Sequence, residues 1–521
     1  MGRKSLIYYS YKILVFLFIV FVILPLLYTL GQALFESGAS SLLKQVFSYE
    51  ALILLAKSIF MSLTVAVLSV IIALFLAFAL YKTNLYAGRI IRLILLLPLF
   101  VPPYIYAVAY KDIFNAFLGS LQGGYAMIAV IFLLVIIYVP LALIIIGGAL
   151  SNTGIEYEEA AWLFTSKRKT IIKILLPLIK PAVFSAFVLV FIFSISEYSI
   201  PVFFGVRVYT TEIFTQFSAF YNHSLAVYQS FLLVIICFVL LYYEHRYIAE
   251  APFLSMGNKG LRIKKYNLGR FSFFVYSSVV FWLVLTVILP VAVLLRQVLM
   301  NTGIFMKAIH LMGKAIANSI SLSVVAASVI VFMAFVIAYY NERHEKNRRY
   351  FDNLLLVVFA IPSIIFGISL IKFYNTSLLD FIYSGSMILI IAYTGKFLFI
   401  AVKLASNSLK QIPFSYEEAS LMAGAGFLKT LRSIILPLMM PVLFLIFLLA
   451  FIFSMSEISL TLMVYPPGME LMPVKVFTIM ANAPDSLNAA MSLISFGVVF
   501  IALMVLYLIY NKVFEKARYR I

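Results

Sequence analysis

Two carboxylates at matching positions are the residues of this chain whose type and placement most directly suggest chemistry. Glu197 and Glu457 each end the pattern FIFS-x-SE after a long apolar run. A charged side chain at the centre of a membrane helix costs about 2.5–3.5 kcal/mol on an insertion scale, so it normally faces protein or water. The two glutamates could therefore line or gate a route for a solute. They could instead accept hydrogen bonds from neighbouring backbone and fix the bend before Pro201 and before Pro466.

Both glutamates close a longer segment that occurs twice. Residues 157–197 and 416–457 each begin with Tyr-Glu-Glu-Ala. These openings lie 259 positions apart and the endings 260, so the first copy lacks one residue. A copy at half the chain length indicates a duplicated unit, and the polar, glycine-containing stretch 244–272 suits a linker. We therefore expect a first half at 1–243, a linker at 244–272 and a second half at 273–521.

The start of the second copy carries local helix signals. Ser415 followed three residues later by Glu418 fits a capping box with the serine as N-cap. Gly424 then interrupts the helix, and a second amphipathic stretch is expected to end at Leu436-Pro437. The pattern predicts a short helix, a turn and another helix lying against the membrane face. Such a projection could dock into a partner's groove, or it could be an interfacial helix without a partner.

Motifs for enzymatic chemistry are missing from the sequence. No G-x-x-x-x-G-K-[ST] segment exists to hold nucleotide phosphates, and no H-E-x-x-H segment exists to hold zinc. The single cysteine, Cys237, lies in an apolar run and cannot form an internal disulfide. We expect no catalytic residues, no cofactor and no metal site on this chain.

The elements that position the glutamates follow from composition. Of 521 residues, 64% are hydrophobic and 11% are charged, whereas soluble chains carry about 45–50% apolar and 25% charged residues. This composition excludes a soluble enzyme, a disordered chain and a secreted disulfide scaffold, and it predicts an all-α polytopic membrane protein. Apolar runs long enough to cross a bilayer predict about twelve transmembrane helices, near 13–34, 59–81, 93–111, 127–150, 182–200, 226–243, 273–295, 319–340, 354–373, 386–402, 441–463 and 488–511.

The basic excess has a topological explanation. The formal net charge is +19, which in a soluble protein would suggest nucleic acid. If the N-terminus is cytoplasmic, 29 of the 39 lysines and arginines fall on the cytoplasmic side, as the positive-inside rule requires. We therefore expect both termini in the cytoplasm, a retained first helix rather than a signal peptide, and no nucleic-acid partner. Lys396, in the tenth span, is expected to extend its amine toward the membrane surface.

Each half then holds six helices and enters and leaves the membrane on the same side. The halves are therefore expected to be parallel repeats, related by an approximate two-fold axis along the membrane normal. Such repeats commonly flank a transport route, although duplication alone could produce a symmetric scaffold. A secondary transporter, which would couple transport through carboxylates such as Glu197 and Glu457, can share this arrangement.

The second copied segment resembles the EAA loop of permease subunits in bacterial and archaeal ABC importers, whose pattern is EAA-x3-G-x9-I-x-L-P. It reads Glu418-Ala419-Ser420, three residues, Gly424, nine residues, then Ile434-Ile435-Leu436-Pro437. Only Ser420 departs from the pattern. Two copies at half-chain spacing make the resemblance specific.

The first copied segment matches the same pattern less fully. It has Glu159-Ala160-Ala161 and Ile174-Leu175-Leu176-Pro177, but Thr165 stands at the glycine position and the spacer is one residue short. Its helix is therefore expected to turn differently, so the two loops need not be equivalent. We place the EAA loops at 156–181 and 415–441.

The resemblance implies an ABC importer permease (MetI-like) fold, with both permease halves in one chain in the plasma (inner) membrane of a prokaryote. It implies two cytoplasmic ABC ATPase subunits that hydrolyse ATP, and an extracytoplasmic substrate-binding protein. The residues implied to contact the ATPases are Glu159, Ala160, Ala161, Thr165, Glu418, Ala419, Ser420 and Gly424.

The resemblance also bears on the substrate. Fused two-half permeases of this family include importers of ferric iron, thiamine and phosphonates. The stretches 456–461 and 465–470, and Pro102-Pro103 after Leu95-Leu96-Leu97-Pro98, look most like ferric iron permeases. Thiamine, phosphonate and polyamine importers remain alternatives, as does an ion-coupled secondary transporter. The permease need not bind metal itself, because in this family the binding protein captures the substrate.

Overall fold

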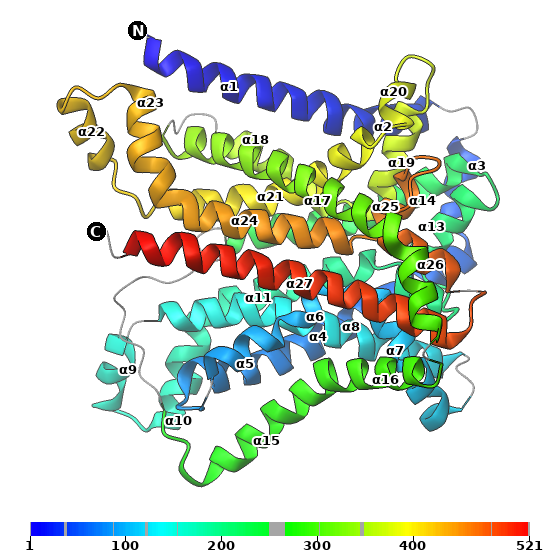
Figure 1. Ribbon diagram of the computed structural model, residues 1–521, viewed down its shortest axis with the longest axis horizontal. Coiled ribbons are helices and arrows are strands. Elements are labelled where there is room, and N and C mark those ends of the chain that lie inside the picture. The colour runs from blue at the N-terminus through cyan, green and yellow to red at the C-terminus, as the bar shows by residue number, and fades with distance from the viewer. Residues whose placement is uncertain are drawn as a thin grey trace. The chain divides into compact units, whose positions relative to one another are not determined.

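The computed structural model describes residues 2–35, 39–86, 88–119, 123–153, 155–248, 266–301, 303–343, 348–480 and 482–518. Most of the expected linker, 249–265, lies outside these ranges. Within them the chain folds into helices and connecting turns, with no β-strand (Figure 1). The all-α class expected from composition is confirmed.

Ten helices are long and apolar enough to cross a membrane, and two bent helix pairs raise the number of candidate spans to twelve. Each of the twelve expected spans corresponds to one of these. The third and ninth spans are not continuous helices, however. The pair Ile90–Phe100 and Pro103–Phe117 is bent by 95°, and the pair Phe351–Ala360 and Ser363–Tyr374 by 104°.

Proline explains both breaks. Pro102 and Pro362 lie 260 positions apart, and each stands at the start of the second helix of a bent pair, in extended conformation with ψ of 133° and 142°. A proline has no N–H to donate and disfavours helical geometry in the residue before it. The helix therefore stops, and the chain leaves in a new direction.

Four further prolines bend no helix sharply but widen it. Each follows a leucine that comes directly after a five-residue π-helical turn. In each turn the leucine N–H bonds to the carbonyl five residues back instead of four, as in Leu436 to Leu431. The wider turn accommodates a proline, which cannot donate and would crowd the carbonyl four residues before it. The turns are η1 (Ile19–Ile23), η2 (Ile171–Leu175), η4 (Val284–Ile288) and η6 (Leu431–Ile435).

The described residues form two compact units. Unit 2 comprises Ser40–Met306 and Asn482–Leu493. Beyond the η turns, its helices are α4 (Tyr49–Lys82), α5 (Gly88–Leu95), α6 (Leu97–Phe100), α7 (Pro103–Leu118), α8 (Gly124–Asn152), α9 (Ile155–Trp162), α10 (Lys167–Thr170), α11 (Leu176–Ser196), α12 (Ser199–Phe203), α13 (Tyr209–Ser218), α14 (His223–Ile248), α15 (Ser272–Leu283) and α16 (Leu289–Leu299), with most of α3 (Ala39–Val46).

Unit 1 comprises Met1–Ala39, Lys307–Ala481 and Ile494–Ile521. Its helices are α1 (Gly2–Phe18), α2 (Leu24–Phe35), most of α17 (Gly303–Arg343), α18 (Arg348–Ala360), α19 (Ser363–Tyr374), α20 (Asp380–Tyr383), α21 (Met387–Leu409), α22 (Ser415–Met422), α23 (Phe427–Thr430), α24 (Leu436–Ser456), α25 (Ser459–Val464) and α26 (Met472–Ile479), with the later part of α27 (Asp485–Arg518).

Segments are exchanged between the units and the sequence halves. The first helix of each half belongs to the unit built mainly from the other half, and Asn482–Leu493 of the second half also belongs to unit 2. Tyrosines hold these helices at their π-helical turns. In unit 1, Tyr374 of α19 donates to the carbonyl of Phe21 in η1 at 2.9 Å. In unit 2, Tyr106 of α7 donates to the carbonyl of Thr286 in η4 at 3.1 Å. The sequence halves describe the duplication, and the compact units describe the packing.

Lys396 of α21 differs from its expected role. Only 5% exposed, it donates from Nζ to the carbonyl of Ile361 at 2.7 Å and to that of Phe359 at 3.3 Å. These carbonyls lie at the break between α18 and α19, where the helix no longer supplies donors. The amine therefore points into the protein and does not reach the membrane surface.

Candidate functional site

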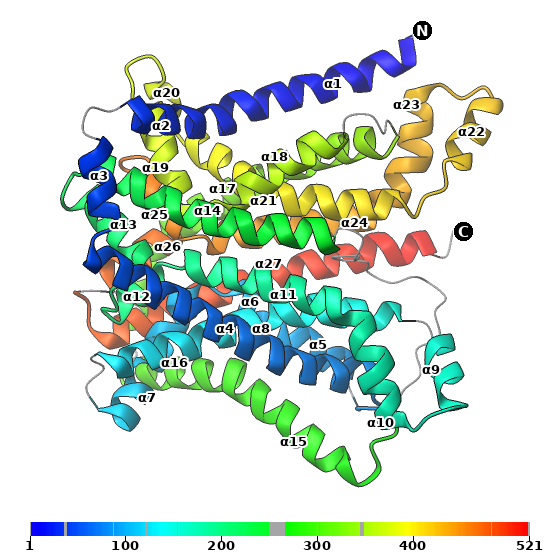
Figure 2. The ribbon, with the colours of Figure 1, turned by 180° about the vertical axis from the view of Figure 1, so that it is seen from behind.

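The first copied loop lies in unit 2 and consists of α9, a turn, and α10 running through η2 into α11. In Figure 2, α9 and α10 lie beyond the N-terminal end of α11. The short helix and the turn agree with the sequence pattern. The second helix does not stop at Leu176-Pro177, because η2 carries it past the proline into the membrane span Arg168–Ser196.

The second copied loop has the same plan in unit 1, with α22, a turn, and α23 running through η6 into α24 (Figure 1). Two local expectations are wrong here. The helix does not end at Leu436-Pro437, since η6 accommodates the proline. Ser415 is the first residue of α22 and not its N-cap, and the N-cap, Phe414, makes no side-chain capping bond. The N–H of Glu418 bonds instead to the carbonyl of Phe414 at 3.2 Å.

One face of each short helix is buried. In the first loop it carries Glu158 and Ala161, and in the second Glu417 and Ser420. These residues are three apart, the spacing that places side chains on one face of a helix. The hydroxyl of Ser420, the one departure from the family pattern, lies 2.8 Å from that of Thr430 and so joins α22 to α23.

Glu158 is bound on both oxygens. Lys82, the last residue of α4, places Nζ 2.5 Å from Oε1, and Tyr266 donates its hydroxyl to Oε2 at 2.6 Å. Glu158 is 1% exposed and Lys82 is fully buried. Burial raises the pKa of Tyr266 above its ordinary value, and the hydrogen bond to Glu158 raises it further, so the phenol remains a donor at physiological pH.

Glu417 is bound in the same way in unit 1. Arg343, the last residue of α17, places Nε 2.7 Å from Oε1, and Tyr339 donates its hydroxyl to Oε2 at 2.6 Å. Arg343 also donates to the carbonyl of Ile412 at 3.2 Å. Each copied loop is therefore attached to the end of a long helix through one buried carboxylate, one cation and one tyrosine.

The opposite face of each short helix is exposed, and it carries most of the residues expected to contact an ATPase. Glu159, Ala160, Glu418, Ala419 and Gly424 are exposed, Thr165 is half-buried, and Ala161 and Ser420 face inward. Beside them lie apolar side chains open to solvent. Phe164 is 90% exposed, Leu163 80% and Met422 89%. Exposed apolar side chains grouped in this way are typical of an interaction surface.

The two loops turn differently, as the glycine mismatch suggested. Gly424 has a φ of +77°, in the left-handed region that favours glycine. Thr165 has no positive φ, and its N–H bonds to the carbonyl of Ala161 at 2.9 Å. A threonine in the left-handed region would be strained, so the first loop closes by a tighter turn.

Glu197 and Glu457 lie at the far ends of α11 and α24, where each helix is followed by a short one. Glu197 Oε1 accepts from the N–H of Ser199 at 2.9 Å and from its hydroxyl at 2.5 Å. Glu457 Oε1 accepts from the N–H of Leu460 at 3.0 Å. Each glutamate therefore satisfies the first turn of α12 or α25, which is the bend-fixing geometry considered from sequence. Tyr138 also donates to Glu197 Oε2 at 3.3 Å.

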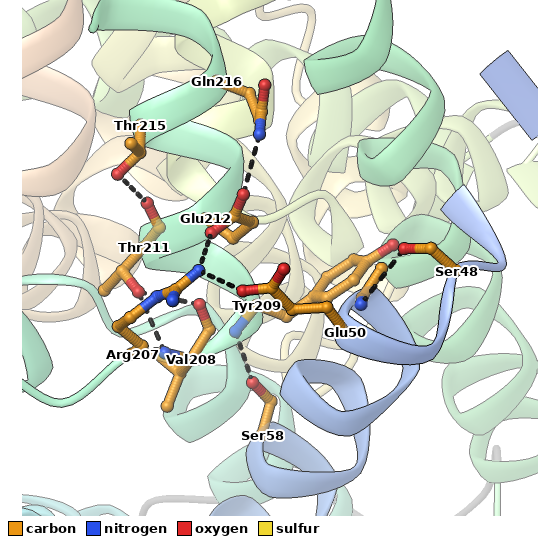
Figure 3. Close-up of polar contacts among 11 residues, drawn as sticks. Ser48, Glu50, Ser58, Arg207, Val208, Tyr209, Thr211, Glu212, Thr215 and Gln216 are labelled. Atoms are coloured by element: carbon orange, nitrogen blue, oxygen red, sulfur yellow. Dashed lines mark hydrogen bonds and ion pairs between the residues drawn. The ribbon is translucent and has the colours of Figure 1, made fainter. Parts of the chain in front are cut away.

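A polar cluster lies at the N-terminal end of α4, opposite to Lys82. Figure 3 shows the guanidinium of Arg207 between the carboxylates of Glu50 and Glu212, at 2.9 and 3.1 Å. Below it, the N–H of Tyr209, the first residue of α13, donates to the hydroxyl of Ser58 at 2.8 Å. The cluster fixes α13 against α4.

Unit 1 repeats this arrangement with the charges exchanged. The N–H of Met472, the first residue of α26, donates to the hydroxyl of Ser319 at 2.8 Å. Lys475 pairs with Glu470 at 2.7 Å, so an acid stands where unit 2 has Arg207 and a base where it has Glu212. The backbone anchor is common to both units, whereas the charge pattern is not.

Among the described residues, no group of three or more His, Cys, Asp or Glu side chains is placed to hold a metal ion. The described residues thus show a duplicated arrangement. A copied loop lies at the N-terminal end of α11 and of α24, and a bend capped by a glutamate lies at the C-terminal end of each. A family model described as "Binding-protein-dependent transport system inner membrane component" matches residues 69–249 and 330–519. The chain belongs to this family.

The two matched segments of this permease correspond to the two sequence halves, which supports the duplication. Its helices agree with a multi-pass membrane protein. Family membership implies ABC transporter partners, namely a substrate-binding protein and an ATPase.

Three similar proteins illustrate how far this permease resembles its relatives. It is 24% identical over 488 residues to the putative ferric transport system permease protein FbpB 1 of Haemophilus influenzae, covering 86% of this chain and 76% of that protein. It is 24% identical over 444 residues to the ferric transport system permease protein FbpB of Actinobacillus pleuropneumoniae, covering 78% and 63%. It is 26% identical over 174 residues to the putative 2-aminoethylphosphonate transport system permease protein PhnV of Salmonella typhimurium, covering 33% and 64%.

Sequence reasoning missed the inward-facing residues of this permease. Glu158 and Glu417 directly precede the glutamates of the EAA pattern, and the three-residue spacing to Ala161 and Ser420 could have separated the two faces of each short helix. No sequence pattern pairs Tyr266 with Glu158, because the tyrosine lies 108 residues from the carboxylate that it binds.

Proposed function

We propose that this permease is the membrane subunit of an ATP-driven importer and that its two copied loops are the contacts for cytoplasmic ATPases. One observation carries the proposal: both loops turn the EAA glutamate and alanine outward beside exposed apolar side chains, while the preceding glutamate holds the loop in place. Small residues allow close approach of a partner helix, the apolar side chains supply burial, and the carboxylate can pair with a basic group.

The proposed orientation places both loops and both termini in the cytoplasm, as the distribution of basic residues favours. Two ATPase subunits would bind one loop each, and a binding protein would deliver substrate at the opposite face. Closure of the ATPases on ATP would then move the loops and, through them, the membrane helices. No cofactor is proposed on this chain, since ATP hydrolysis would reside on the partners.

Removing the exposed apolar side chains tests the proposed contact. We expect Phe164→Ser together with Met422→Ser to lower the amount of co-purified ATPase at least about tenfold, because the apolar centre of an interface carries most of its affinity. Phe220→Ser is the matched control, since Phe220 is also exposed but lies between α13 and α14. Equal co-purification of the double variant and the wild type would contradict the proposed contact. Uptake that needs no ATPase would favour a secondary transporter instead.

Ferric iron is the proposed substrate. The two ferric permeases align over 78–86% of this chain, whereas the phosphonate permease aligns over 33%. The proposal predicts that a ferric-loaded binding protein stimulates ATP hydrolysis by the reconstituted complex, while the same assay with thiamine, 2-aminoethylphosphonate or a polyamine and their binding proteins does not. Stimulation by one of these organic substrates alone would reassign the importer.

Glu197 and Glu457 are proposed to line or gate the route for the substrate, in addition to capping α12 and α25. Their duplication at one repeat position and the cost of an acid at membrane depth support this role. The two functions are separable, because capping needs an acceptor oxygen and a role in the pathway needs the charge.

A further inference from the structure

The two copied loops are attached to long helices by the same three chemical groups, but the tyrosines that supply the third group do not correspond in the repeat. The copied glutamates Glu158 and Glu417 lie 259 positions apart. Their cations, Lys82 and Arg343, lie 261 apart, as do the anchoring serines Ser58 and Ser319 on the same two helices, and differ only in type. The duplication therefore preserved the carboxylate and a cation at the matching helix position.

The tyrosines, in contrast, come from different elements. Tyr339 belongs to α17, the same helix that supplies Arg343. Tyr266 belongs to the segment that joins the two halves and lies just before η3 (Gly269–Phe271), which leads into α15. In unit 2 the third group thus comes from outside the first half.

We propose that Glu158 and Glu417 are positioning residues that transmit movement between each copied loop and a long membrane helix, and that Tyr266 makes the inter-half segment part of this link in unit 2. The inference rests on the proposed function of the loops as ATPase contacts. Beyond that function, the inference names the residues that would transmit the movement of each loop and the helices, α4 and α17, that would receive it.

Burial gives each link its stiffness. Glu158, Lys82 and Tyr266 are all buried, as are Glu417 and Tyr339. A buried ion pair contributes little net stability, because desolvation offsets the attraction, and apolar replacements are often as stable. Removing one partner, however, is strongly unfavourable, so the pair holds its two elements in one relative position. A contact of this kind is better suited to fixing a register than to stabilising a fold.

Tyr266 contacts both the end of α4 and the short helix α9 and so connects them. Its N–H donates to the carbonyl of Lys82 at 2.6 Å, and it pairs with Thr83 in an isolated parallel bridge. Its ring packs edge-on against Trp162 of α9, with centroids 5.5 Å apart. Displacement of α9 must therefore pull on the end of α4 and on the chain entering α15 together.

Transport per ATP hydrolysed distinguishes this link from a merely structural contact. In proteoliposomes with the ATPase and the binding protein, we expect Glu158→Gln to lower uptake per ATP about tenfold, within the usual range of coupling between sites, while the ATPase still co-purifies. Because Glu158→Gln leaves Lys82 buried and unpaired, the double variant Lys82→Met/Glu158→Gln supplies a folded form without the ion pair. Wild-type uptake per ATP in the double variant would overturn the proposal.

Variants of the outward glutamate and of the tyrosines complete the test. Glu159→Gln is expected to weaken ATPase binding, whereas Glu158→Gln is expected to keep ATPase binding and to lower uptake per ATP. Tyr266→Phe and Tyr339→Phe each remove one hydroxyl and keep the ring, and both are expected to lower uptake per ATP. A loss with Tyr339→Phe but not with Tyr266→Phe would remove the inter-half segment from the link. If the wild-type complex does not bind an ATPase at all, the proposed function fails, whatever the anchor variants do.

Discussion

Lys396 Nζ lies 2.7 Å from the carbonyl oxygen of Ile361, at the point where the ninth span breaks. Proline removes the donors that would have satisfied this end of α18. In lipid an unsatisfied carbonyl is costly, and the lysine amine supplies the missing donor. The first half breaks at the equivalent proline, Pro102. Alignment of Tyr138 and Ser151-Asn152 with Tyr393 and Ser406-Asn407 places Leu141 opposite Lys396, so the sequence has no lysine at this position in the first half.

Replacing the lysine by an apolar residue of similar length should therefore destabilise unit 1. We expect Lys396→Met to lower the free energy of unfolding by about 1.5–3 kcal/mol, the worth of hydrogen bonds to a charged donor. The measurement is the thermal midpoint Tm of the purified protein in detergent. Leu141→Met is the matched control and should change the stability by less than about 1.5 kcal/mol. An equal Tm for the two variants would show that the carbonyls need no amine.

Much of the architecture could be read from the sequence, because bilayer thickness and the distribution of basic residues constrain it strongly. The duplication was also visible, since YEEA and FIFS-x-SE recur at half-chain spacing. The two breaks at Pro102 and Pro362 were not predicted, because a proline inside an apolar run can also be accommodated without a sharp bend. Pro177 and Pro437 show that alternative, with a π-helical turn and no sharp bend.

The candidate site was found at the level of the segment but not at the level of the helix face. The EAA pattern pointed to Glu159 and Glu418, which are exposed, and gave no role to Glu158 and Glu417, which are buried. The partners of the buried pair could not be deduced, since Tyr266 reaches Glu158 only through tertiary packing. Lys396 was misread for the same reason: a lysine near a helix end extends to the surface unless a broken helix offers it carbonyls.

Two buried serines, Ser58 and Ser319, accept the hydrogen bonds that hold the first residues of α13 and α26, and their contribution to local stability can be tested. Ser58→Ala leaves the N–H of Tyr209 without its acceptor, and we expect a loss of about 1–3 kcal/mol from an unsatisfied buried donor. Ser319→Ala should have a similar effect on α26, because it accepts from Met472 at the same distance. Hydrogen exchange of the α13 and α26 amides measures both.

The salt bridge above Ser58 provides the contrast. Arg207 and Glu50 are both mostly exposed, and such pairs contribute about 0–1 kcal/mol. Glu50→Gln should therefore change exchange in α13 much less than Ser58→Ala does. A larger effect of Glu50→Gln would show that the charged cluster, and not the backbone anchor, holds the short helix.

The last prediction separates the two roles of Glu197 and Glu457. Glutamine keeps an acceptor oxygen for the N–H groups of Ser199 and Leu460, so Glu197→Gln/Glu457→Gln should retain the bends and the Tm of the wild type. Removal of both charges is nevertheless expected to lower substrate uptake and binding-protein-stimulated ATP hydrolysis. Glu197→Ala, which removes the acceptor as well, is the control for the structural role and should lower the free energy of unfolding by about 1 kcal/mol or more. Unchanged uptake and unchanged hydrolysis in the double glutamine variant would leave the two carboxylates with capping alone.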